Sequence, residues 1–477
     1  MKFRITMGSM GVAALLLLAG PAFSQSFRVQ CPQTTTLHPN GSTVDAAHPG
    51  LIKCQEIAGG DGYATMGDGT QTYLFGFGPL SGRDNIASGQ PGTLAAADFI
   101  ADPSGGGNAA ATEPAAIMGN GVLSAQQPAP LMAIDEDDEF FLTLSNVGMI
   151  MRPDLFEQHT VHFHGYPNAS SFYDGVPDAS VAIAIAASFT YYYTAPDAGT
   201  YFWHCHITPP EHLQMGMVGQ LYVRPRQNRV VAATVGTSDN LRAALIAANQ
   251  ATVNNSTGTG LTCTDLLCTG QTPAPAAQPS PAVSQPQGSL YAYNDGDGST
   301  RYDVEYPIQL MGFDPNFHYV GMTFNPEAFA DMKDKYFMIS GRGYPDTVSA
   351  GPIKTLDSDG TLRTSQAFDS TIRIKAGKRA LLRISDLNVT EFHTLATVGI
   401  PMTVIADNAR LLRDMAGNNL YYQTNSVTLG GGESTDVILD TAGVAAGTYY
   451  LYSTNLDHLS NDAENFGGMM TEIVVSL

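Results

Sequence analysis

Short runs of alternating polar and apolar residues recur along most of this chain. Examples are residues 139–144, 188–193, 371–374 and 380–384. The alternation has a period of two, which is the period of a β-strand with one buried face. Turn signals such as Asp197-Ala-Gly and Ala445-Ala-Gly separate the runs. Short strands punctuated in this way predict an all-β chain of sandwich or barrel domains rather than βαβ units.

A segment of different composition interrupts this pattern between residues 226 and 289. From Gln271 it reads Gln-Thr-Pro-Ala-Pro-Ala-Ala-Gln-Pro-Ser-Pro, which is typical of an extended linker. A chain of 477 residues is also longer than one hydrophobic core normally organises. We therefore predict a first domain over residues 27–225, a Pro/Ala-rich linker over 226–289 and a second domain over 290–477.

The two predicted domains repeat each other in sequence. The seven residues from His159 (HTVHFHG) align with the seven from His393 (HTLATVG), and the eight from Gly199 (GTYFWHCH) align with the eight from Gly447 (GTYYLYST). Such self-similarity indicates duplication of one β domain. The first copy has His162, His164, His204, Cys205 and His206. At the aligned positions the second copy has Ala396, Val398, Tyr452, Ser453 and Thr454. We therefore expect the second domain to lack the metal site that the histidines and the cysteine could form in the first.

The first 24 residues have the pattern of a secretory signal peptide. Lys2 and Arg4 precede an apolar run over residues 12–18, and Ala22-Phe-Ser offers small residues for cleavage. This run is shorter than the roughly 20 apolar residues that cross a bilayer, and no later stretch approaches that length. We therefore predict an exported protein, periplasmic or extracellular, without a membrane span. The net charge of −21 argues against nucleic acid as a partner.

The five cysteines fit an oxidising compartment and leave one thiol over. Cys31 and Cys54 lie in one turn-rich region, and Cys263 and Cys268 lie in another, so each pair is a candidate disulfide. The remaining cysteine is Cys205, in the sequence His-Cys-His. An exported protein rarely keeps a free thiol without a use, so metal ligation is the first role to consider.

Six of the eleven histidines fall between residues 159 and 212. Side chains alternate between the two faces of a strand, so residues an even number apart share a face. His162 and His164 therefore share one face, and His159 takes the other. In the second cluster, the two histidines that flank Cys205 share a face, and Cys205 takes the other. If the two strands are neighbours, two separate metal sites result, linked by the backbone at Cys205.

The first of these sites combines His159, Cys205, His212 and Met217. Two imidazoles, a thiolate and a weakly bound thioether are the ligand set of a blue, type 1 copper. Zinc in a structural site would take a closed tetrahedral set without methionine. Met215 is an alternative axial ligand, but the spacing favours Met217.

The second site gathers four imidazoles and no thiolate. Its members are His162, His164, His204 and His206. This set suits a copper ion that binds an exogenous oxygen ligand. Because the set adjoins Cys205 along the backbone, it has an electron path from the first site.

These motifs resemble the paired signatures of the multicopper oxidase family. They read His159-x-x-His-x-His-Gly and His204-Cys-His-x5-His-x3-Gly-Met. The resemblance implies two cupredoxin-type Greek-key β-sandwich domains, of which the second is degenerate. It also implies type 1 copper on the first ligand set, and for the second set a place in the type 2/type 3 cluster that reduces oxygen to water. By the same resemblance, the type 1 copper takes electrons from a small-molecule or protein donor.

The chain departs from the family pattern in two places. Five residues, 207–211, precede His212 in its loop, where the family usually has three. A full trinuclear cluster also takes eight histidines in four His-x-His pairs, whereas this chain has two pairs. The unpaired histidines outside the motifs are His38, His48, His318, His393 and His458. A homotrimer is one arrangement that would bring further ligands to the site.

A second interpretation is an enzyme like the copper nitrite reductases, which also have two cupredoxin domains. His164 and His204 match the two ligands that the first domain of that family gives to type 2 copper, and His458 lies near the place of the third. His393 lies roughly where that family keeps an active-site histidine, whereas His162 takes the place of its catalytic aspartate. A third interpretation is a blue-copper electron carrier without enzymatic activity, whose second set holds no copper.

One carboxylate is a candidate for proton transfer at the second site. Asp174-Gly175 resembles the Asp-Gly of oxidase first domains, where an acid near the cluster supplies protons. Turn formation would explain the dipeptide equally well. The overall prediction is a copper-dependent oxidoreductase that passes electrons from type 1 copper to the histidine-rich site. There it reduces oxygen, or a similar acceptor such as nitrite.

Overall fold

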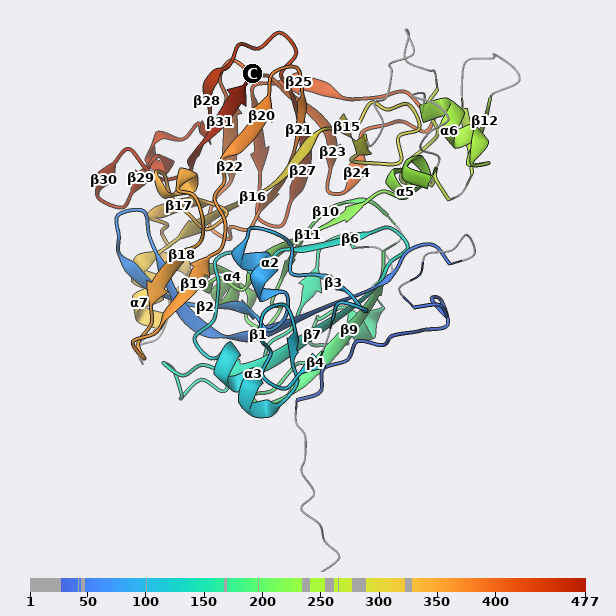
Figure 1. Ribbon diagram of the computed structural model, residues 1–477. Helices are drawn as coiled ribbons and strands as arrows, with labels where there is room; N and C mark the ends of the chain where they lie inside the picture. The colour runs from blue at the N-terminus through green and yellow to red at the C-terminus, as the bar shows by residue number, and fades with distance from the viewer. Residues whose placement is uncertain are drawn as a thin grey trace, which may run out of the picture.

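The chain forms two β domains that stack on each other. The computed structural model describes residues 27–41, 43, 48–99, 101–166, 170–195, 197–233, 241–253, 261–264, 266–276, 289–321 and 328–477. The predicted signal peptide, residues 1–24, lies outside this part of the chain. In Figure 1 the first domain is coloured from blue to green and the second mainly from yellow to red. The strands confirm the prediction of an all-β chain.

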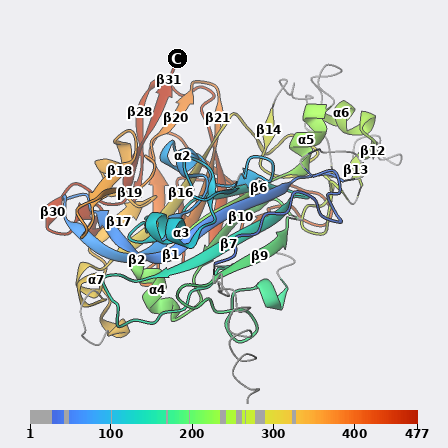
Figure 2. The ribbon, with the colours of Figure 1, turned by 60° about the horizontal axis from the view of Figure 1, so that its bottom comes forward.

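The first domain is a sandwich of two sheets. One sheet has the strand order β2-β1-β7-β9, with β3 also paired to β1, and the other has the order β6-β11-β10-β8. The bounds of these strands are β1 Ile52–Thr65, β2 Gln71–Pro79, β3 Leu94–Ala95, β6 Met132–Asp135, β7 Glu139–Gly148, β8 His162–Phe163, β9 Ser188–Thr194, β10 Gly199–His204 and β11 Val218–Arg224. Figure 2 shows β1, β7 and β9 running side by side across this domain.

The second domain is built on the same plan with larger sheets. One sheet has the order β24-β23-β27-β21-β16-β17-β29-β30, with β25 paired to β23, and the other has the order β20-β31-β28-β22-β26. The bounds are β16 Val304–Phe313, β17 Tyr336–Ile339, β20 Ile372–Lys375, β21 Arg379–Asp386, β22 His393–Thr397, β23 Met402–Asp407, β24 Arg410–Leu411, β25 Tyr422–Thr424, β26 Ser426–Leu429, β27 Ser434–Asp440, β28 Gly447–Ser453, β29 Ser460–Asn461, β30 Glu464–Asn465 and β31 Met470–Ser476. Two ladders lie outside these sheets, formed by β14 Leu290–Tyr291 with β15 Arg301–Tyr302 and by β18 Ile353–Leu356 with β19 Leu362–Gln366.

Strand pairing confirms the internal repeat. In the first domain β10 lies between β8 and β11, and in the second β28 lies between β22 and β31. His204 on β10 pairs with His162 on β8. At the aligned positions, Tyr452 on β28 pairs with Ala396 on β22. The same register in both copies shows that the sequence alignment of the two halves is also a structural equivalence.

Short helices and ladders occupy the connections. The helices are α2 Arg83–Ala87, α3 Pro114–Gly121, α4 Pro209–Met215, α5 Arg226–Ala233, α6 Leu241–Ala247 and α7 Pro315–Gly321. The 3-10 turns are η1 Ser171–Tyr173, η2 Phe329–Asp331, η3 Asp346–Val348 and η4 Leu456–His458. The remaining strands are β4 Ala101–Asp102, β5 Ala110–Ala111, β12 Ala251–Val253 and β13 Leu261–Cys263. No helix in the described residues is long and apolar enough to cross a membrane.

The predicted linker region carries structure of its own. Its described residues include α5, α6 and the β12–β13 ladder, which lie to one side of the two domains (Figure 1). Cys263 and Cys268 form a disulfide here, and Cys31 and Cys54 form a second one in the first domain. Both predicted pairings are confirmed, and Cys205 is the free, buried cysteine among the described residues.

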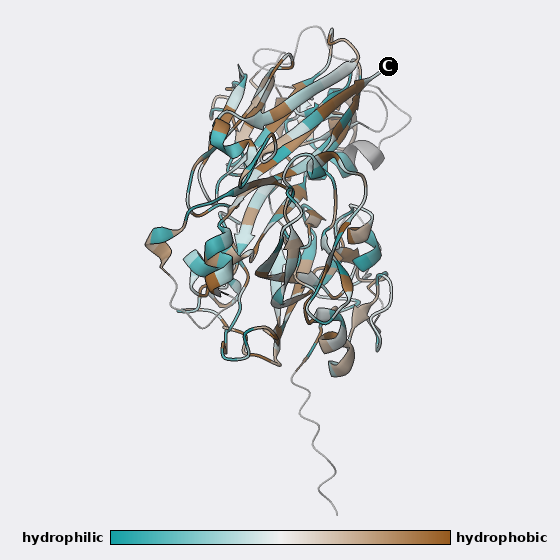
Figure 3. Ribbon diagram, turned by 90° about the vertical axis from the view of Figure 1, so that its left-hand side faces the viewer, coloured by the Kyte–Doolittle hydropathy of each residue, from teal (hydrophilic) through white to brown (hydrophobic). Residues whose placement is uncertain are grey.

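Each domain has a separate apolar core, and a third cluster joins them. Apolar residues recur along the strands between polar ones (Figure 3), which is the pattern that buries one face of each sheet. At the domain boundary, Leu213 packs in one cluster with Met311 and Phe313 of the second domain. Thr200 on β10 donates its hydroxyl to Asp436 on β27 at 2.6 Å. The first domain's metal-binding strands therefore rest directly on the second domain.

Candidate metal centres

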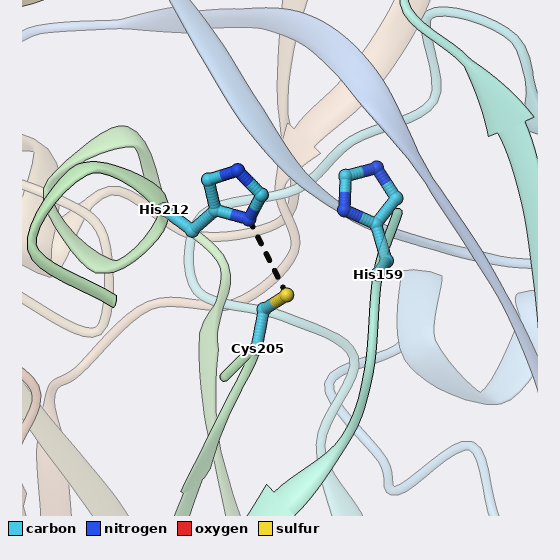
Figure 4. Close-up of side chains that lie close together, drawn as sticks. All are labelled: His159, Cys205 and His212. Atoms are coloured by element: carbon cyan, nitrogen blue, oxygen red, sulfur yellow. Dashed lines mark hydrogen bonds between the residues drawn. The ribbon is translucent and has the colours of Figure 1, made fainter. Parts of the chain in front are cut away.

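The first predicted ligand set comes together at the end of β10. His159, Cys205 and His212 place one ligand atom each within 4.8 Å of one another. Figure 4 shows the two imidazoles and the thiol turned toward a common point. The Nδ1 atom of His212 lies 3.3 Å from the Cys205 Sγ atom, and the backbone N–H of Thr160 donates to the same sulfur at 3.4 Å. The residues next to β8 and β10 and the helix α4 therefore assemble ligands that lie up to 53 positions apart.

Burial at this set fits a metal ion. All three side chains have an exposed fraction of 0%. Both ring nitrogens of His159 and the Nε2 atom of His212 have no hydrogen-bond partner. Burial lowers the pKa of His159 well below its usual value and that of His212 to about 3, so both rings are neutral. Buried lone pairs without donors cost free energy unless a metal ion accepts them, and neutral imidazoles are the form that binds metals.

The Cys205 thiol is the third member of this candidate copper-binding set. Burial raises the pKa of the Cys205 thiol to about 11, so without a metal the sulfur keeps its proton. A metal ion would displace that proton, because the thiolate is the ligand form. Two imidazoles and one thiolate in a trigonal set match the preference of copper in type 1 sites.

Helix α4 carries the rest of the predicted first set. The helix begins at Pro209 and ends at Met215, where Gly216 adopts a φ of 118°. This turn returns the chain to β11, so that the Met217 carbonyl accepts the Cys205 backbone N–H at 3.1 Å. Met215 and Met217 are both fully buried in the core cluster that includes Cys205. The structure therefore keeps both methionines next to this site, and Met217 remains the predicted axial ligand.

The second domain holds α4 in place. The side-chain amide of Gln214 donates to Asp334 at 2.9 Å and accepts the backbone N–H of Asp314 at 3.1 Å. His318 on α7 has its two ring nitrogens 2.9 Å and 2.5 Å from the carbonyl oxygens of Gln214 and Tyr73. Helices α4 and α7 accordingly lie side by side in both Figure 1 and Figure 2. The ligand-bearing loop is thus held by residues that lie about 100 positions or more away in sequence.

One functional candidate near the first set was not found from the sequence. A carboxylate oxygen of Glu157 lies 3.7 Å from the Nε2 atom of His212. The Glu157 side chain is 26% exposed, whereas His212 is fully buried. Glu157 therefore lies between solvent and the ligand set. No sequence motif marks this residue, because Glu157 and His212 are brought together only when the chain folds.

The second predicted set also comes together, with three members instead of four. His162, His164 and His204 place one nitrogen each within 4.8 Å of one another. The Nε2 atoms of His164 and His204 lie 2.9 Å apart. His206 stacks beside His162 and His204, with ring centroids 5.1 Å and 5.4 Å away, but it is not part of this three-nitrogen group. The strand parity of the sequence therefore predicted the face correctly, while His206 lies at its margin.

Backbone carbonyls orient two of the three imidazoles. The Nδ1 atom of His162 donates to the Asp174 carbonyl at 2.8 Å, and that of His204 donates to the Cys205 carbonyl at 2.6 Å. The His164 ring lies against the turn at Gly432 in the second domain. A proton on Nδ1 leaves a lone pair on Nε2, which is the usual way in which a metal-binding histidine is oriented.

Burial also keeps the His164 and His204 rings neutral. It lowers the pKa of His164 to about 4 and that of His204 well below its usual value. The His164 and His204 Nε2 atoms lie 2.9 Å apart, where one neutral ring can donate to the other, and a metal ion bound by both nitrogens would replace that hydrogen bond. The three residues therefore fit a metal ion. Asp174 also contacts this set, since its carboxylate lies 3.5 Å from the His162 Nδ1 atom and is 32% exposed.

The second domain keeps a copy of the first site without its sulfur ligand. Ser453 lies at the position of Cys205, and its hydroxyl is 3.3 Å from the Nδ1 atom of His458. His393 stacks edge-on against His458 with centroids 5.3 Å apart, as His159 lies 5.4 Å from its partner in the first domain. Here hydrogen bonds satisfy the rings. Asp386 and Asn388 contact His393, and Glu391 contacts His458. The expectation that this domain lacks the first site's thiolate chemistry agrees with this network.

A cavity of about 370 Å³ adjoins the second set. Its walls are His164, Phe202, the start of α4, the segment 388–392 and the glycine turn 430–432. A Cβ atom on Gly432 would lie 2.7 Å from the His164 ring, so the turn approaches the ring only because it has no side chain. The cavity gives small molecules a route to the rim of the second set.

Comparison with known proteins agrees with the ligand geometry. Residues 112–228 match one family model described as multicopper oxidase, and residues 325–474 match another with the same description. Together the two matches span more than half of the chain. The chain belongs to the multicopper oxidase family. Copper is therefore the cofactor of this chain.

Individual members of the multicopper oxidase family match only parts of this chain. It is 32% identical over 116 residues to the multicopper oxidase MCE of Talaromyces pinophilus, which is 24% of this chain and 18% of that protein. It is 40% identical over 68 residues to the multicopper oxidase CTB12 of Cercospora beticola, or 14% and 10% of the two chains. This chain thus matches less than a fifth of either relative's length.

Solved structures of the family share the overall fold. The multicopper oxidase mgLAC is 16% identical, with a TM-score of 0.52 over 89% of this chain and 86% of that one. The blue copper oxidase of Nitrosomonas europaea is 18% identical, with a TM-score of 0.50 over 88% and 85% of the two chains. These matches confirm the predicted cupredoxin-type architecture of both domains.

Proposed function

We propose that this protein is an exported copper-dependent oxidoreductase of multicopper oxidase type. A small-molecule or protein donor would deliver electrons to a type 1 copper held by His159, Cys205, His212 and Met217. The electrons would pass to a histidine-rich copper site that reduces oxygen or a similar acceptor. Copper supplies one-electron chemistry at both sites, since it cycles between Cu(I) and Cu(II).

The observation that carries this proposal is the connection between the two ligand sets. His204 and Cys205 are consecutive residues, and each belongs to a different set. The Nδ1 atom of His204 also donates to the Cys205 carbonyl at 2.6 Å. One peptide unit and one hydrogen bond therefore link the sulfur of the first set to an imidazole of the second. A protein that only stored copper would have no need of such a link.

The surrounding residues provide what electron entry and acceptor reduction need. Glu157 is partly exposed and lies 3.7 Å from the buried His212 ring, so a donor can approach the first set at Glu157. Asp174 is partly exposed and contacts His162, so it can hand protons from solvent to the second set. The adjoining cavity reaches His164 from the surface. Donor, proton and acceptor thus have separate approaches.

Export is part of the proposal. The N-terminal pattern of basic residues, an apolar run and a small-residue cleavage site supports it. The disulfides Cys31–Cys54 and Cys263–Cys268 add to this support, because disulfides persist in oxidising compartments. We expect the protein in the periplasm or outside the cell.

Electron paramagnetic resonance on copper-loaded protein, with spins counted per chain, tests the function. We expect a type 1 signal together with a signal from the second set. Oxygen consumption should then follow addition of a one-electron donor, and nitrite should be tested as a second acceptor. A type 1 signal with a total of one copper per chain and no acceptor reduction would instead indicate an electron carrier.

A further inference from the structure

We infer that the second centre is a mononuclear copper site, completed by one chain with His162, His164 and His204, and not half of a trinuclear cluster. This inference rests on the proposed function for the presence of copper. It departs from what family membership implies, because the family's cluster takes eight histidines.

The three imidazoles form a set that is complete for one ion. His162 and His204 have their Nδ1 atoms hydrogen-bonded to the backbone carbonyls of Asp174 and Cys205, and the His164 ring lies against the turn at Gly432. One nitrogen of each ring lies within 4.8 Å of the corresponding atoms of the other two. A three-nitrogen set leaves an open coordination position for an exogenous ligand, as catalytic metal sites do. The cavity beside His164 leads to that side of the set.

The histidines outside the two sets are engaged elsewhere. All eleven histidines lie in the described residues. His318, His393 and His458 are 0%, 0% and 1% exposed, and each is hydrogen-bonded inside the second domain or at the domain boundary. His38 is 3% exposed and binds Glu139. None of these four can turn toward a copper on the surface of another chain.

Assembly of several copies therefore does not restore the family's cluster through the second domain. The positions aligned with the second set hold Ala396, Val398, Tyr452 and Thr454. A neighbouring copy that presented this face would offer no imidazole. Within one chain, His206 and His48 bring the three histidines of the second set to five, fewer than the eight that a trinuclear cluster needs. A homotrimer is accordingly not required to complete the site.

The number of metal ions limits the reduction that one loaded chain can perform. One type 1 copper and one three-histidine copper store two electrons per chain. Reduction of oxygen to water takes four electrons, whereas two electrons and two protons convert it to hydrogen peroxide. The two-copper chain would therefore release hydrogen peroxide from oxygen, with the electrons coming from the two Cu(I) ions and the protons from solvent through Asp174.

Copper stoichiometry and electron paramagnetic resonance on the full-length, copper-loaded protein test this inference. We expect two coppers per chain, with type 1 and type 2 signals of equal intensity that account for all of the metal. A total clearly above two would overturn it. Copper that gives no resonance signal because two ions are magnetically coupled would also overturn it. So would a total of one, since the second set would then hold no ion.

Two matched variants test whether His164, but not His206, is needed to bind the second copper. His164→Ala should lower the total to one copper and remove the type 2 signal, while His206→Ala should keep both coppers. Loss of the second copper in the His206→Ala protein would contradict the three-histidine site. The type 1 signal serves as the internal control for folding in both variants. If it is absent even from the wild-type protein, the proposed function fails and not this inference alone.

A single-turnover measurement gives an independent readout. The fully reduced protein, freed of excess donor, is mixed with oxygen, and peroxide is quantified with a dye and peroxidase. We expect about one peroxide per chain, which catalase abolishes. Oxygen uptake without peroxide, at one oxygen for every four electrons, would indicate reduction to water and would overturn the inference.

Discussion

Ser453 in the second domain lies where Cys205 lies in the first. Each is fully buried, and each donates its backbone N–H to a methionine carbonyl, Met469 at 2.9 Å and Met217 at 3.1 Å. Each side chain also lies 3.3 Å from the Nδ1 atom of a buried histidine. The duplicated domain has therefore kept the scaffold of the first site and exchanged one sulfur for an oxygen.

Replacing Cys205 by serine should leave the first domain folded and remove its type 1 copper. Ser453 shows that a serine fits this position of the fold, but a hydroxyl does not supply the thiolate that defines a type 1 site. The second centre faces the other way and should keep its ion. Absorption and electron paramagnetic resonance should show loss of the type 1 signal, with copper per chain falling from two to one.

Two results of the Cys205→Ser experiment would each contradict a different assignment. A blue signal that survives in Cys205→Ser would contradict the assignment of the sulfur ligand. Circular dichroism of the metal-free variant is the control for folding. If that form were unfolded, the equivalence of Ser453 and Cys205 would be wrong.

Replacing Gly432 by alanine should weaken copper binding at the second centre. The added Cβ would lie 2.7 Å from the His164 ring, so the ring must move away from its partners. Loss of a group that orients a metal-binding histidine typically lowers metal affinity by about 10–100-fold. Copper titration followed by the type 2 signal measures this change, and the type 1 signal should stay unchanged.

Gly443→Ala is the matched control for the glycine variant. Gly443 also has a positive φ, 77° against 88° for Gly432, but no atom lies within 4 Å of its Cβ position. Both variants therefore carry a similar backbone strain of about 1–2 kcal/mol. Equal loss of copper in the two proteins would show that strain, rather than contact with His164, is responsible.

The contribution of Glu136 to the free energy of unfolding should fall as the pH rises from about 4.3, the usual pKa of glutamate, to about 7. Histidines whose pKa is lowered by burial, such as His159 and His212, contribute with the opposite sign below about pH 6.5. Burial raises the pKa of Glu136 to about 7. In this range the folded protein keeps a proton that the unfolded chain has released, so raising the pH favours unfolding. The effect should level off above pH 7. Urea denaturation at several pH values measures the slope.

Glu136→Gln should remove this contribution, so the loss of unfolding free energy caused by the variant should become smaller as the pH rises from about 4.3 to about 7. The amide has a similar shape and can accept the hydrogen bond that Asn294 donates to Glu136, but it does not titrate. Some slope should remain, because burial also raises the pKa of Asp138 to about 7. An unchanged slope in the variant would mean that Glu136 ionises normally in the folded protein.

Replacing Arg383 by methionine should strongly destabilise the protein. Arg383 is fully buried, its Nε atom lies 3.1 Å from a Glu305 carboxylate oxygen, and Asp436 lies 3.9 Å from its Nη1 atom. The variant would leave buried carboxylates without this partner, at a cost of about 3–5 kcal/mol. Urea denaturation at pH 7 gives the loss in unfolding free energy.

Arg373→Met is the surface comparison. Arg373 pairs with Asp369 at 2.9 Å, but its side chain is 53% exposed. Loss of an exposed pair costs at most about 1 kcal/mol. A similar loss in both variants would show that burial of Arg383 does not matter to its contribution.

Much of the first site could be predicted from the sequence because the signals are local. Strand alternation is set by each residue's immediate neighbours, so it separated Cys205 from His204 and His159 from His162 before any contact was known. The repeat read from the sequence also has a structural counterpart, because Tyr452 pairs with Ala396 at the positions where His204 pairs with His162. Counting showed that one cysteine is left over, whereas the two disulfide pairs were only candidates until the structure joined them.

Other features depend on contacts between distant parts of the chain. Glu157 reaches His212 across a loop, and Gly432 reaches His164 from another domain, so neither belongs to a motif. His206 has the parity of a ligand, yet its position beside the three-nitrogen group depends on how the strand end bends. The burial of His393 and His458 in the second domain also could not be predicted from the sequence.

The sequence by itself therefore determined the fold class, the duplication, the ligand types and the face on which each ligand lies. These properties follow from backbone periodicity and from the chemistry of single side chains. Only the tertiary structure decided which ring nitrogens converge, which histidines are too deeply buried to leave their own domain, and how the second domain supports α4. Those outcomes depend on packing between residues that are far apart in the chain, where shape and burial rather than residue type select the contact.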